Sequence, residues 1–166
     1  MKNPDFIQQK IFTLPKLLQQ VDRWKFLGKK IAFTNGCFDI LHEGHIFSLS
    51  QAAREGDVLV VGVNADASTN RLKGPNRPVN NEHSRALLMA SLLMVDAVVI
   101  FEEDTPYEVI KQIVPDILVK GEDWSIENIV GRDIVESNGG KVETIKFVNN
   151  QSTTNIIKIV LERFKE

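Results

Sequence analysis

The sequence predicts a doubly wound α/β fold, a Rossmann-like domain built on one parallel sheet. Short β-rich runs recur along the chain and alternate with longer stretches of helical pattern, as expected when helices connect parallel strands. The run VLVVGVN is apolar at almost every position, which is typical of a strand covered by helices on both faces. The length of 166 residues suits a single hydrophobic core.

The chain is expected to divide into an N-terminal helical appendage, residues 1–28, and a main domain, residues 29–166. The appendage helix is indicated by the apolar positions Leu17, Leu18, Val21 and Phe26, and Gly28 is expected to close it. Five runs then predict the strands of the sheet: IAFTN from Ile31, VLVVGVN from Val58, AVVIF from Ala97, DILV from Asp116 and VETIKF from Val142.

Two later helices are predicted from apolar spacing. The run ALLMASLLMV, residues 86–95, is apolar almost all round, so a helix there is expected to be buried, with Arg85 at its edge. An unpaired buried arginine is costly, so Arg85 is expected to meet either an acid or a phosphate. The last helix is predicted from Thr153 to Phe164, and its candidate N-caps are Ser152, Thr153 and Thr154.

Composition excludes several classes of function. A net charge of −2 gives no general attraction to nucleic acid or to acidic membranes, so neither is an expected partner. The single cysteine, Cys37, allows no internal disulfide and no cysteine cluster for zinc, and it is expected to be a small packing residue. No signal-peptide pattern and no spanning segment is found, so we predict a cytoplasmic protein.

The densest chemical signal is TNGCFDILHEGH, from Thr34 to His45, where the first long strand ends and a helix opens near Gly44. Ligands of open α/β sheets bind beyond the carboxyl ends of strands, and a helix N-terminus offers unpaired N–H groups to phosphate. His42 and His45 are three residues apart, so on a helix they share one face. They could both donate to a phosphate, or pack, or bind a metal, although no third zinc ligand has matching spacing and no metal site is predicted.

The H-x-G-H of His42 to His45, together with S-T-T at residues 152–154, resembles the cytidylyltransferase-like nucleotidyltransferase superfamily. From about residue 13 to the end, the chain resembles the adenylyltransferase domain of bifunctional ADP-heptose synthases. The resemblance rests on five stretches in order: TNGCFDILHEGH, NADASTNRLKGPNRPVN, VDAVVIFEEDTP, PDILVKGEDW and STTNIIKIV.

This resemblance implies an enzyme that transfers AMP from ATP to D-glycero-β-D-manno-heptose 1-phosphate. The products are ADP-heptose and pyrophosphate, Mg²⁺ is required, and the pathway leads to the lipopolysaccharide core. It assigns catalytic roles to His42, His45 and Lys73. It implies that the nucleotide is bound by Thr34, Asn35, Gly36, Phe38, Gly44, Arg85, Gly121, Asp123, Trp124, Ser152 and Thr153. The acceptor is expected to meet Asp39, Asp66 and Arg77, and either acid could instead hold Mg²⁺.

Two other functions remain open, and the first is a cytidylyltransferase that acts on glycerol 3-phosphate or a similar small phosphate ester. The motif G-E-D-W at residues 121–124 differs from the G-G-D-Y expected of heptose enzymes and is similar to the G-D-D-W of glycerol-3-phosphate cytidylyltransferases. However, FVNNQ before Ser152 lacks that family's arginine-containing R-T-E-G-I. The second is a non-catalytic nucleotide-binding regulatory module. By analogy a homodimer is expected, and the chain length suggests that a separate protein carries the heptose kinase.

Overall fold

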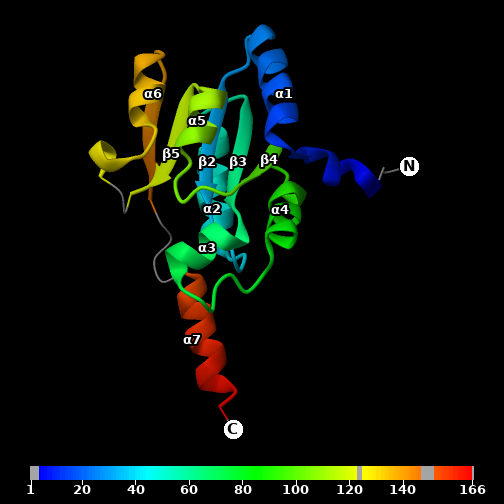
Figure 1. The fold of residues 1–166 in the computed structure, drawn as a ribbon, viewed down its shortest axis with the longest axis vertical. Helices are drawn as coiled ribbons and strands as arrows, with labels where there is room; N and C mark the ends of the chain where they lie inside the picture. The colour runs from blue at the N-terminus through cyan, green and yellow to red at the C-terminus, as the bar shows by residue number, and fades with distance from the viewer. Residues whose placement is uncertain (1–3, 123–124, 147–151, 166) are drawn as a thin grey trace.

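The computed structural model describes residues 4–122, 125–146 and 152–165 (Figure 1). Its centre is a six-stranded sheet with the order β1-β4-β3-β2-β5-β6, in which all neighbouring strands are parallel. The strands are β1 (Ile11–Phe12), β2 (Ile31–Gly36), β3 (Val58–Asn64), β4 (Ala97–Phe101), β5 (Ile117–Gly121) and β6 (Lys141–Ile145). The predicted parallel α/β sheet is therefore confirmed, with β1 as an additional short edge strand.

Helices follow the strands along the chain, as the alternating pattern predicts. They are α1 (Leu14–Phe26), α2 (Glu43–Arg54), α3 (Asp66–Lys73), α4 (Glu82–Ser91), α5 (Tyr107–Ile113), α6 (Arg132–Ser137) and α7 (Thr153–Arg163). Three 3₁₀ turns are also present, η1 (Pro4–Phe6), η2 (Gln8–Lys10) and η3 (Ile126–Asn128). In the part of the chain that the structure describes, no helix is long and apolar enough to cross a membrane.

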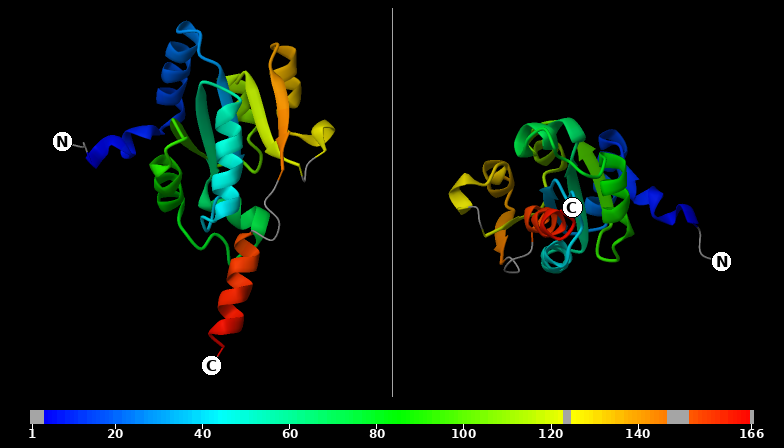
Figure 2. Two further views of the ribbon diagram at one scale, coloured as in Figure 1. Left: turned by 180° about the vertical axis from the view of Figure 1, so that it is seen from behind. Right: turned by 90° about the horizontal axis from the view of Figure 1, so that it is seen from below.

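The helices cover both faces of the sheet, which confirms the doubly wound arrangement. Strand side chains alternate between the two faces, so Val58 and Val60 join one apolar cluster while Leu59 and Val61 join the other. The first cluster contains side chains of α1, α5 and α6, and the second contains side chains of α2 and α4. Figure 2 shows α2 on the face of the sheet opposite to the one seen in Figure 1.

The N-terminal segment is part of the main core. Leu17 and Val21 of α1 are buried in the same cluster as the side chains of α5, and β1 pairs with β4. Gly28 has a φ of +71°, the left-handed conformation with which a glycine closes a helix. Phe26 was expected on the apolar face but is 91% exposed. The domain boundary at residue 28 stays a prediction, but residues 11–26 pack as an integral layer.

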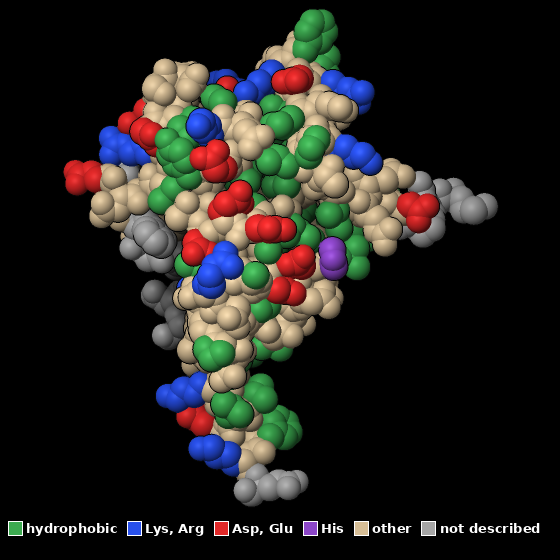
Figure 3. All heavy atoms as spheres, in the orientation of Figure 1, with side chains coloured by type: hydrophobic (Ala, Val, Ile, Leu, Met, Phe, Trp, Pro, Cys, Tyr) green, Lys and Arg blue, Asp and Glu red, His purple; other side chains and the backbone are tan. Residues whose placement is uncertain are grey.

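Helix α4 exposes apolar side chains that the sequence pattern predicted to be buried. The prediction that residues 86–95 are buried all round is wrong, because α4 lies in an outer layer and has only one face against the sheet. Ala86, Met89 and Ala90 are buried there, whereas Leu87, Leu88 and Leu93 are exposed. Helix α7 projects away from the sheet, and Figure 3 shows apolar and basic side chains along it. Its exposed apolar residues include Val160, Leu161 and Phe164.

The order of the strands reverses at β2. The chain continues from β2 to β3 and β4 on one side, whereas β5 and β6 lie on the other side. The helices that follow β2 and β5 also pack on opposite faces, α2 in one apolar cluster and α6 in the other. Such a topological switch point is where open α/β sheets bind ligands, beyond the carboxyl ends of the strands. The fold therefore locates the candidate site at the ends of β2 and β5.

Candidate active site

A tight turn connects the end of β2 to the start of α2. Phe38 in this turn has a φ of 47°, a left-handed conformation that is uncommon for a bulky residue. A Cβ at Gly36 would lie 3.2 Å from the Phe38 ring, so the missing side chain of Gly36 lets that ring fold back over the strand end. His42 is the N-cap of α2, and its carbonyl accepts a hydrogen bond of 3.0 Å from the His45 amide. The turn therefore sets the position of His42 at the start of α2.

The imidazole rings of His42 and His45 are stacked, although His42 is the extended N-cap of α2 and only His45 lies within the helix. Their centroids are 3.8 Å apart with an interplanar angle of 23°, and the Phe38 ring lies 5.3 Å from His45 in an edge-on arrangement. Both Nδ1 atoms are buried, and neither has a hydrogen-bond partner among the described residues. Buried polar atoms in native proteins usually have partners, so these two atoms are exceptions among the described residues.

Burial favours the uncharged form of both imidazoles. Loss of solvation, with a smaller contribution from the neighbouring His42, lowers the pKa of His45 to about 4. Burial also lowers the pKa of His42, partly opposed by the charge of Glu43. A neutral imidazole has one N–H donor, and the first turn of α2 adds unpaired backbone N–H groups and a positive dipole end. The arrangement can therefore donate hydrogen bonds to phosphate oxygens without carrying charge.

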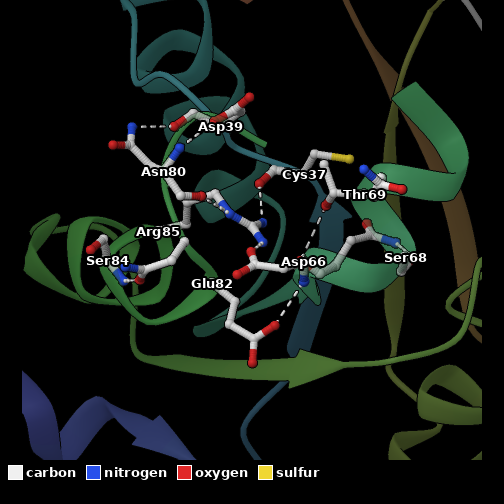
Figure 4. Close-up of polar contacts among 12 residues, drawn as sticks. Cys37, Asp39, Asp66, Ser68, Thr69, Asn80, Glu82, Ser84 and Arg85 are labelled. Atoms are coloured by element: carbon white, nitrogen blue, oxygen red, sulfur yellow. Dashed lines mark hydrogen bonds and ion pairs between the residues drawn. The ribbon is translucent and has the colours of Figure 1, made fainter. Parts of the chain in front are cut away.

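Arg85 is fully buried, and its guanidinium joins three segments at the same edge of the sheet (Figure 4). It donates to the Asp66 carboxylate at 2.7 Å, to the Cys37 carbonyl at 2.5 Å and to the Asn80 carbonyl at 2.9 Å. Glu82 accepts from the backbone N–H of Asp66 at 2.7 Å. Of the two partners that the sequence left open for Arg85, the structure provides the acid. Its predicted contact with the nucleotide stays a prediction.

Asp39 forms a second connection, between the histidine turn and the loop that joins α3 to α4. Its carboxylate is buried and accepts from the Arg77 guanidinium at 2.5 Å and from the backbone N–H groups of Val79 and Asn80 at 2.8 and 2.9 Å. The Asp39 carbonyl accepts from the Asn80 side chain at 2.7 Å. Asp39 and Arg77 thus contact each other, and their predicted role at the acceptor stays a prediction.

Lys73 and Lys120 differ in their exposure and contacts. Lys73 is the last residue of α3, rather than a loop residue, and Gly74 follows it with a φ of +97°. Its side chain is exposed, and no hydrogen bond or ion pair engages it within the described segments. Lys120 on β5, which sequence reasoning missed, donates to the Asn35 side chain on β2. The only sequence signal for Lys120 is a lysine near the end of an otherwise apolar strand.

The first turn of α7 lies beside the histidine turn. Ser152 is the N-cap of this helix and accepts from the Asn155 amide at 3.1 Å, which confirms it as the capping residue. Thr153 is buried and donates to the Ile40 carbonyl at 3.4 Å. Thr34 is buried near the end of β2, Gly44 is buried in the first turn of α2, and Gly121 ends β5. The predicted base-binding residues Asp123 and Trp124 lie outside the described residues.

The described residues contain no group of three or more histidine, cysteine or acidic side chains that could hold a metal ion. Asp39 is enclosed by its donors, whereas the side chain of Asp66 remains 40% exposed beside Arg85. Asp66 is therefore the acid of this edge with room for a further ligand.

The stacked histidine pair lies at the N-terminus of α2, at the switch point of the parallel sheet, where open α/β proteins bind their ligands. Residues 33–159 match the cytidylyltransferase-like family, and the chain belongs to this family of nucleotidyltransferases. The resemblance read from H-x-G-H is thereby confirmed at the level of the family.

The curated relatives include several bacterial proteins named bifunctional protein HldE. The one from Paramagnetospirillum magneticum is 56% identical over 151 residues, which cover 91% of this chain and 31% of the relative. The one from Citrifermentans bemidjiense is 52% identical over 155 residues, 93% of this chain and 32% of the relative. The chain therefore spans about a third of the length of these relatives.

Solved structures show the same fold. The lipopolysaccharide core biosynthesis protein from Thermoplasma volcanium GSS1 has a TM-score of 0.61 and 31% sequence identity, covering 75% of this chain and 100% of that chain. Pantoate-beta-alanine ligase from Francisella tularensis has a TM-score of 0.58 at 16% identity, covering 92% and 78% of the two chains. The second likeness supports the fold alone.

Arg85→Met should destabilise the protein by about 2 to 4 kcal/mol, because it removes the fully buried guanidinium that donates to two half-buried carbonyls and to Asp66. Urea unfolding measures this. The matched control is Arg71→Met, which removes an ion pair with Asp104 whose two side chains are each 50% exposed, and it should cost at most about 1 kcal/mol. If Arg85→Met unfolds at the parent's urea concentration but loses nucleotide affinity, Arg85 is a nucleotide ligand rather than a structural connection.

His45→Gln should reduce the acid sensitivity of the fold. The unfolded chain binds a proton at His45 near pH 6.5, whereas the folded protein binds it only near a pKa of about 4. The free energy of unfolding of the parent should therefore fall between pH 6.5 and pH 4, and this residue contributes about 3 kcal/mol of the loss. Urea titrations at several pH values test this, with His83→Gln on the exposed surface of α4 as control. Identical pH dependence of parent and His45→Gln contradicts the prediction.

Proposed function

We propose that this chain transfers AMP from ATP to D-glycero-β-D-manno-heptose 1-phosphate, giving ADP-heptose and pyrophosphate for the lipopolysaccharide core. The observation that carries the reaction type is the neutral His42–His45 pair at the start of α2. The choice of substrates is supported by the HldE relatives and by the five sequence stretches that resemble ADP-heptose synthases. Because this chain spans only about a third of the length of these relatives, we propose for it the AMP-transfer reaction and not their whole activity.

The proposed chemistry is a direct displacement at phosphorus. A phosphate oxygen of the heptose 1-phosphate forms a bond to the α-phosphorus of ATP, and the bond from that phosphorus to the oxygen bridging to the β-phosphate breaks. Pyrophosphate carries away the electron pair of the broken bond. Because a sugar phosphate is already an anion at neutral pH, the site needs donors and orientation rather than a strong base. His42 and His45 would donate to the α-phosphate oxygens as charge grows in the transition state.

Positive charge for the outer phosphates would come from other elements. Lys73, exposed and unengaged by the described residues, would reach the triphosphate from the end of α3. The first turn of α7, with Ser152 and Thr153, would receive the outgoing phosphates through its unpaired N–H groups. The contact of Thr153 with Ile40 supports this assignment, because it brings that turn beside the histidines.

Mg²⁺ would enter with the nucleotide. This ion is usually held by one or two carboxylates together with substrate phosphates, rather than by a cage of protein ligands. Asp66 fits that requirement better than Asp39, since its side chain is partly exposed while Asp39 is enclosed. The ion would neutralise charge on the phosphates and on the leaving pyrophosphate.

Other parts of the assignment stay predictions. They are the nucleotide contacts of Thr34, Asn35, Gly36, Phe38, Gly44, Gly121, Asp123 and Trp124, the homodimer, the separate heptose kinase and the cytoplasmic location. Sedimentation of the purified chain tests the homodimer. A crystal structure with ATP tests the contacts.

A matrix of pyrophosphate release tests the substrate pair. With Mg²⁺ present, ATP and heptose 1-phosphate should react at least about tenfold faster than CTP and glycerol 3-phosphate, a difference of about 1.4 kcal/mol in activation free energy. His45→Ala, which should lower kcat about 100-fold, controls for a contaminating enzyme. Preference for the CTP pair would instead identify a cytidylyltransferase, and no release with any pair would favour the regulatory module.

Lys73→Ala should lower kcat/KM for ATP by at least about tenfold while the urea midpoint stays at the parent value. The reason is that an exposed lysine at a helix end contributes charge to bound phosphate and little to the core. Lys73→Arg should recover only part of the rate, because a planar guanidinium presents its charge differently. Lys111→Ala, at an exposed lysine of α5, is the matched control. Unchanged turnover in Lys73→Ala would remove Lys73 from the site.

A further inference from the structure

Lys120 and Asn35 face each other across the switch point of the sheet. The ladder between β2 and β5 pairs Ala32 with Ile117 and Phe33 with Leu118. Continuing that register by two residues places Asn35 opposite Lys120. There the Lys120 ammonium donates to the Asn35 side-chain oxygen. A side-chain contact thus joins the two strands at the end where the ligand of an open α/β sheet binds.

The chemistry of this contact fixes which way the Asn35 amide points. An ammonium group has only donors, so its partner in an amide must be the oxygen and not the nitrogen. The Asn35 NH₂ group therefore points away from Lys120, and it has no acceptor among the described residues. Since Asn35 is only half-buried, that donor is available to a ligand.

The opposite side of Asn35 is restrained by the backbone of β3. Gly62 pairs with Asn35 in the β2–β3 ladder, and a Cβ on Gly62 would lie 3.1 Å from the Asn35 Cβ and 2.9 Å from the Phe33 ring. The missing side chain of Gly62 therefore provides the space that the Asn35 stem occupies beside β3. In that space the contact with Lys120 holds the oxygen of the amide.

We propose that Lys120 is a positioning residue that holds the Asn35 amide with its NH₂ group toward a bound nucleoside triphosphate. This rests on the nucleotide of the proposed function and not on the sugar. Asn35 directly precedes Gly36 and the turn that leads to His42, so the oriented donor and the histidine pair belong to the same edge. Lys120 acts through Asn35 and is not assigned a contact with the nucleotide.

A double-mutant cycle tests the action of Lys120 through Asn35. The probe is the non-hydrolysable adenosine 5′-(α,β-methylene)triphosphate, and the measurement is its Kd by calorimetry. Lys120→Met and Asn35→Ala should each raise Kd by about tenfold, and the double variant should be no worse than about tenfold, because both changes remove the same oriented donor. Effects that multiply to about 100-fold would show that Lys120 contacts the nucleotide itself and would overturn the proposal, as would an unchanged Kd in Lys120→Met.

Asn35→Asp separates an oriented donor from a mere structural connection. A carboxylate still accepts from Lys120, so the urea midpoint should be at least that of the parent, yet Kd for the analogue should rise at least about tenfold because the NH₂ donor is gone. If Asn35→Asp binds the analogue like the parent, the donor role is wrong. Lys120→Arg keeps a group with donors only and should restore Kd to within about threefold, and failure of that rescue in a folded variant also counts against the proposal.

Controls keep this result distinct from that of the proposed function. Lys141→Met changes a lysine of the neighbouring strand β6 that pairs with Glu55 and Glu143 on the surface, and it should leave Kd unchanged. If the parent binds the analogue but releases no pyrophosphate with heptose 1-phosphate, the proposed function fails and the binding cycle still decides the role of Lys120. If the parent prefers the CTP analogue, the same cycle is measured with it, and a parent that binds neither analogue overturns the inference.

Discussion

The buried guanidinium of Arg85 is the constraint on which the carboxyl edge of the sheet depends. A guanidinium out of contact with water needs acceptors, and each of the three nitrogens of Arg85 donates to one, from Cys37, Asp66 and Asn80. These residues belong to the histidine turn, the start of α3 and the loop before α4. Arg77, which lies in that loop, donates to Asp39 in the histidine turn. Protein contacts thus connect the histidine turn to the helix that carries Lys73.

The strands β3 and β4 were predictable because each is a short, almost wholly apolar run that follows an aspartate. The run VLVVGVN coincides with β3 from Val58 to Asn64, whereas the two residues of β1 are too few to carry a period. The sequence could not show that Leu87 and Leu88 are exposed, because an apolar run does not reveal which of its faces another element covers. Phe26 illustrates the same limit, since its helical spacing from Leu17 and Val21 did not bring it into the core.

The histidine pair was predictable because its signal is local: a strand end, a turn and a helix start within twelve residues of sequence. The partners of the charged groups were not predictable, since they come from distant parts of the chain. Arg85 and Cys37 are 48 positions apart, and Lys120 and Asn35 are 85 apart. Such contacts depend on strand register and on which strands are neighbours, and these are properties of the assembled sheet.

The neutral state of His42 and His45 has a consequence for ionic strength. Dissolved salt screens interactions between exposed charges over roughly 8 to 10 Å at ordinary concentrations, but it has little effect on hydrogen bonds from uncharged, buried donors. Under the proposed roles, the exposed Lys73 attracts the outer phosphates by charge, whereas the histidines hold the reacting phosphate by N–H groups. Added salt would then weaken capture of the nucleotide more than the step that follows capture. On this proposal, long-range attraction and short-range alignment belong to different side chains.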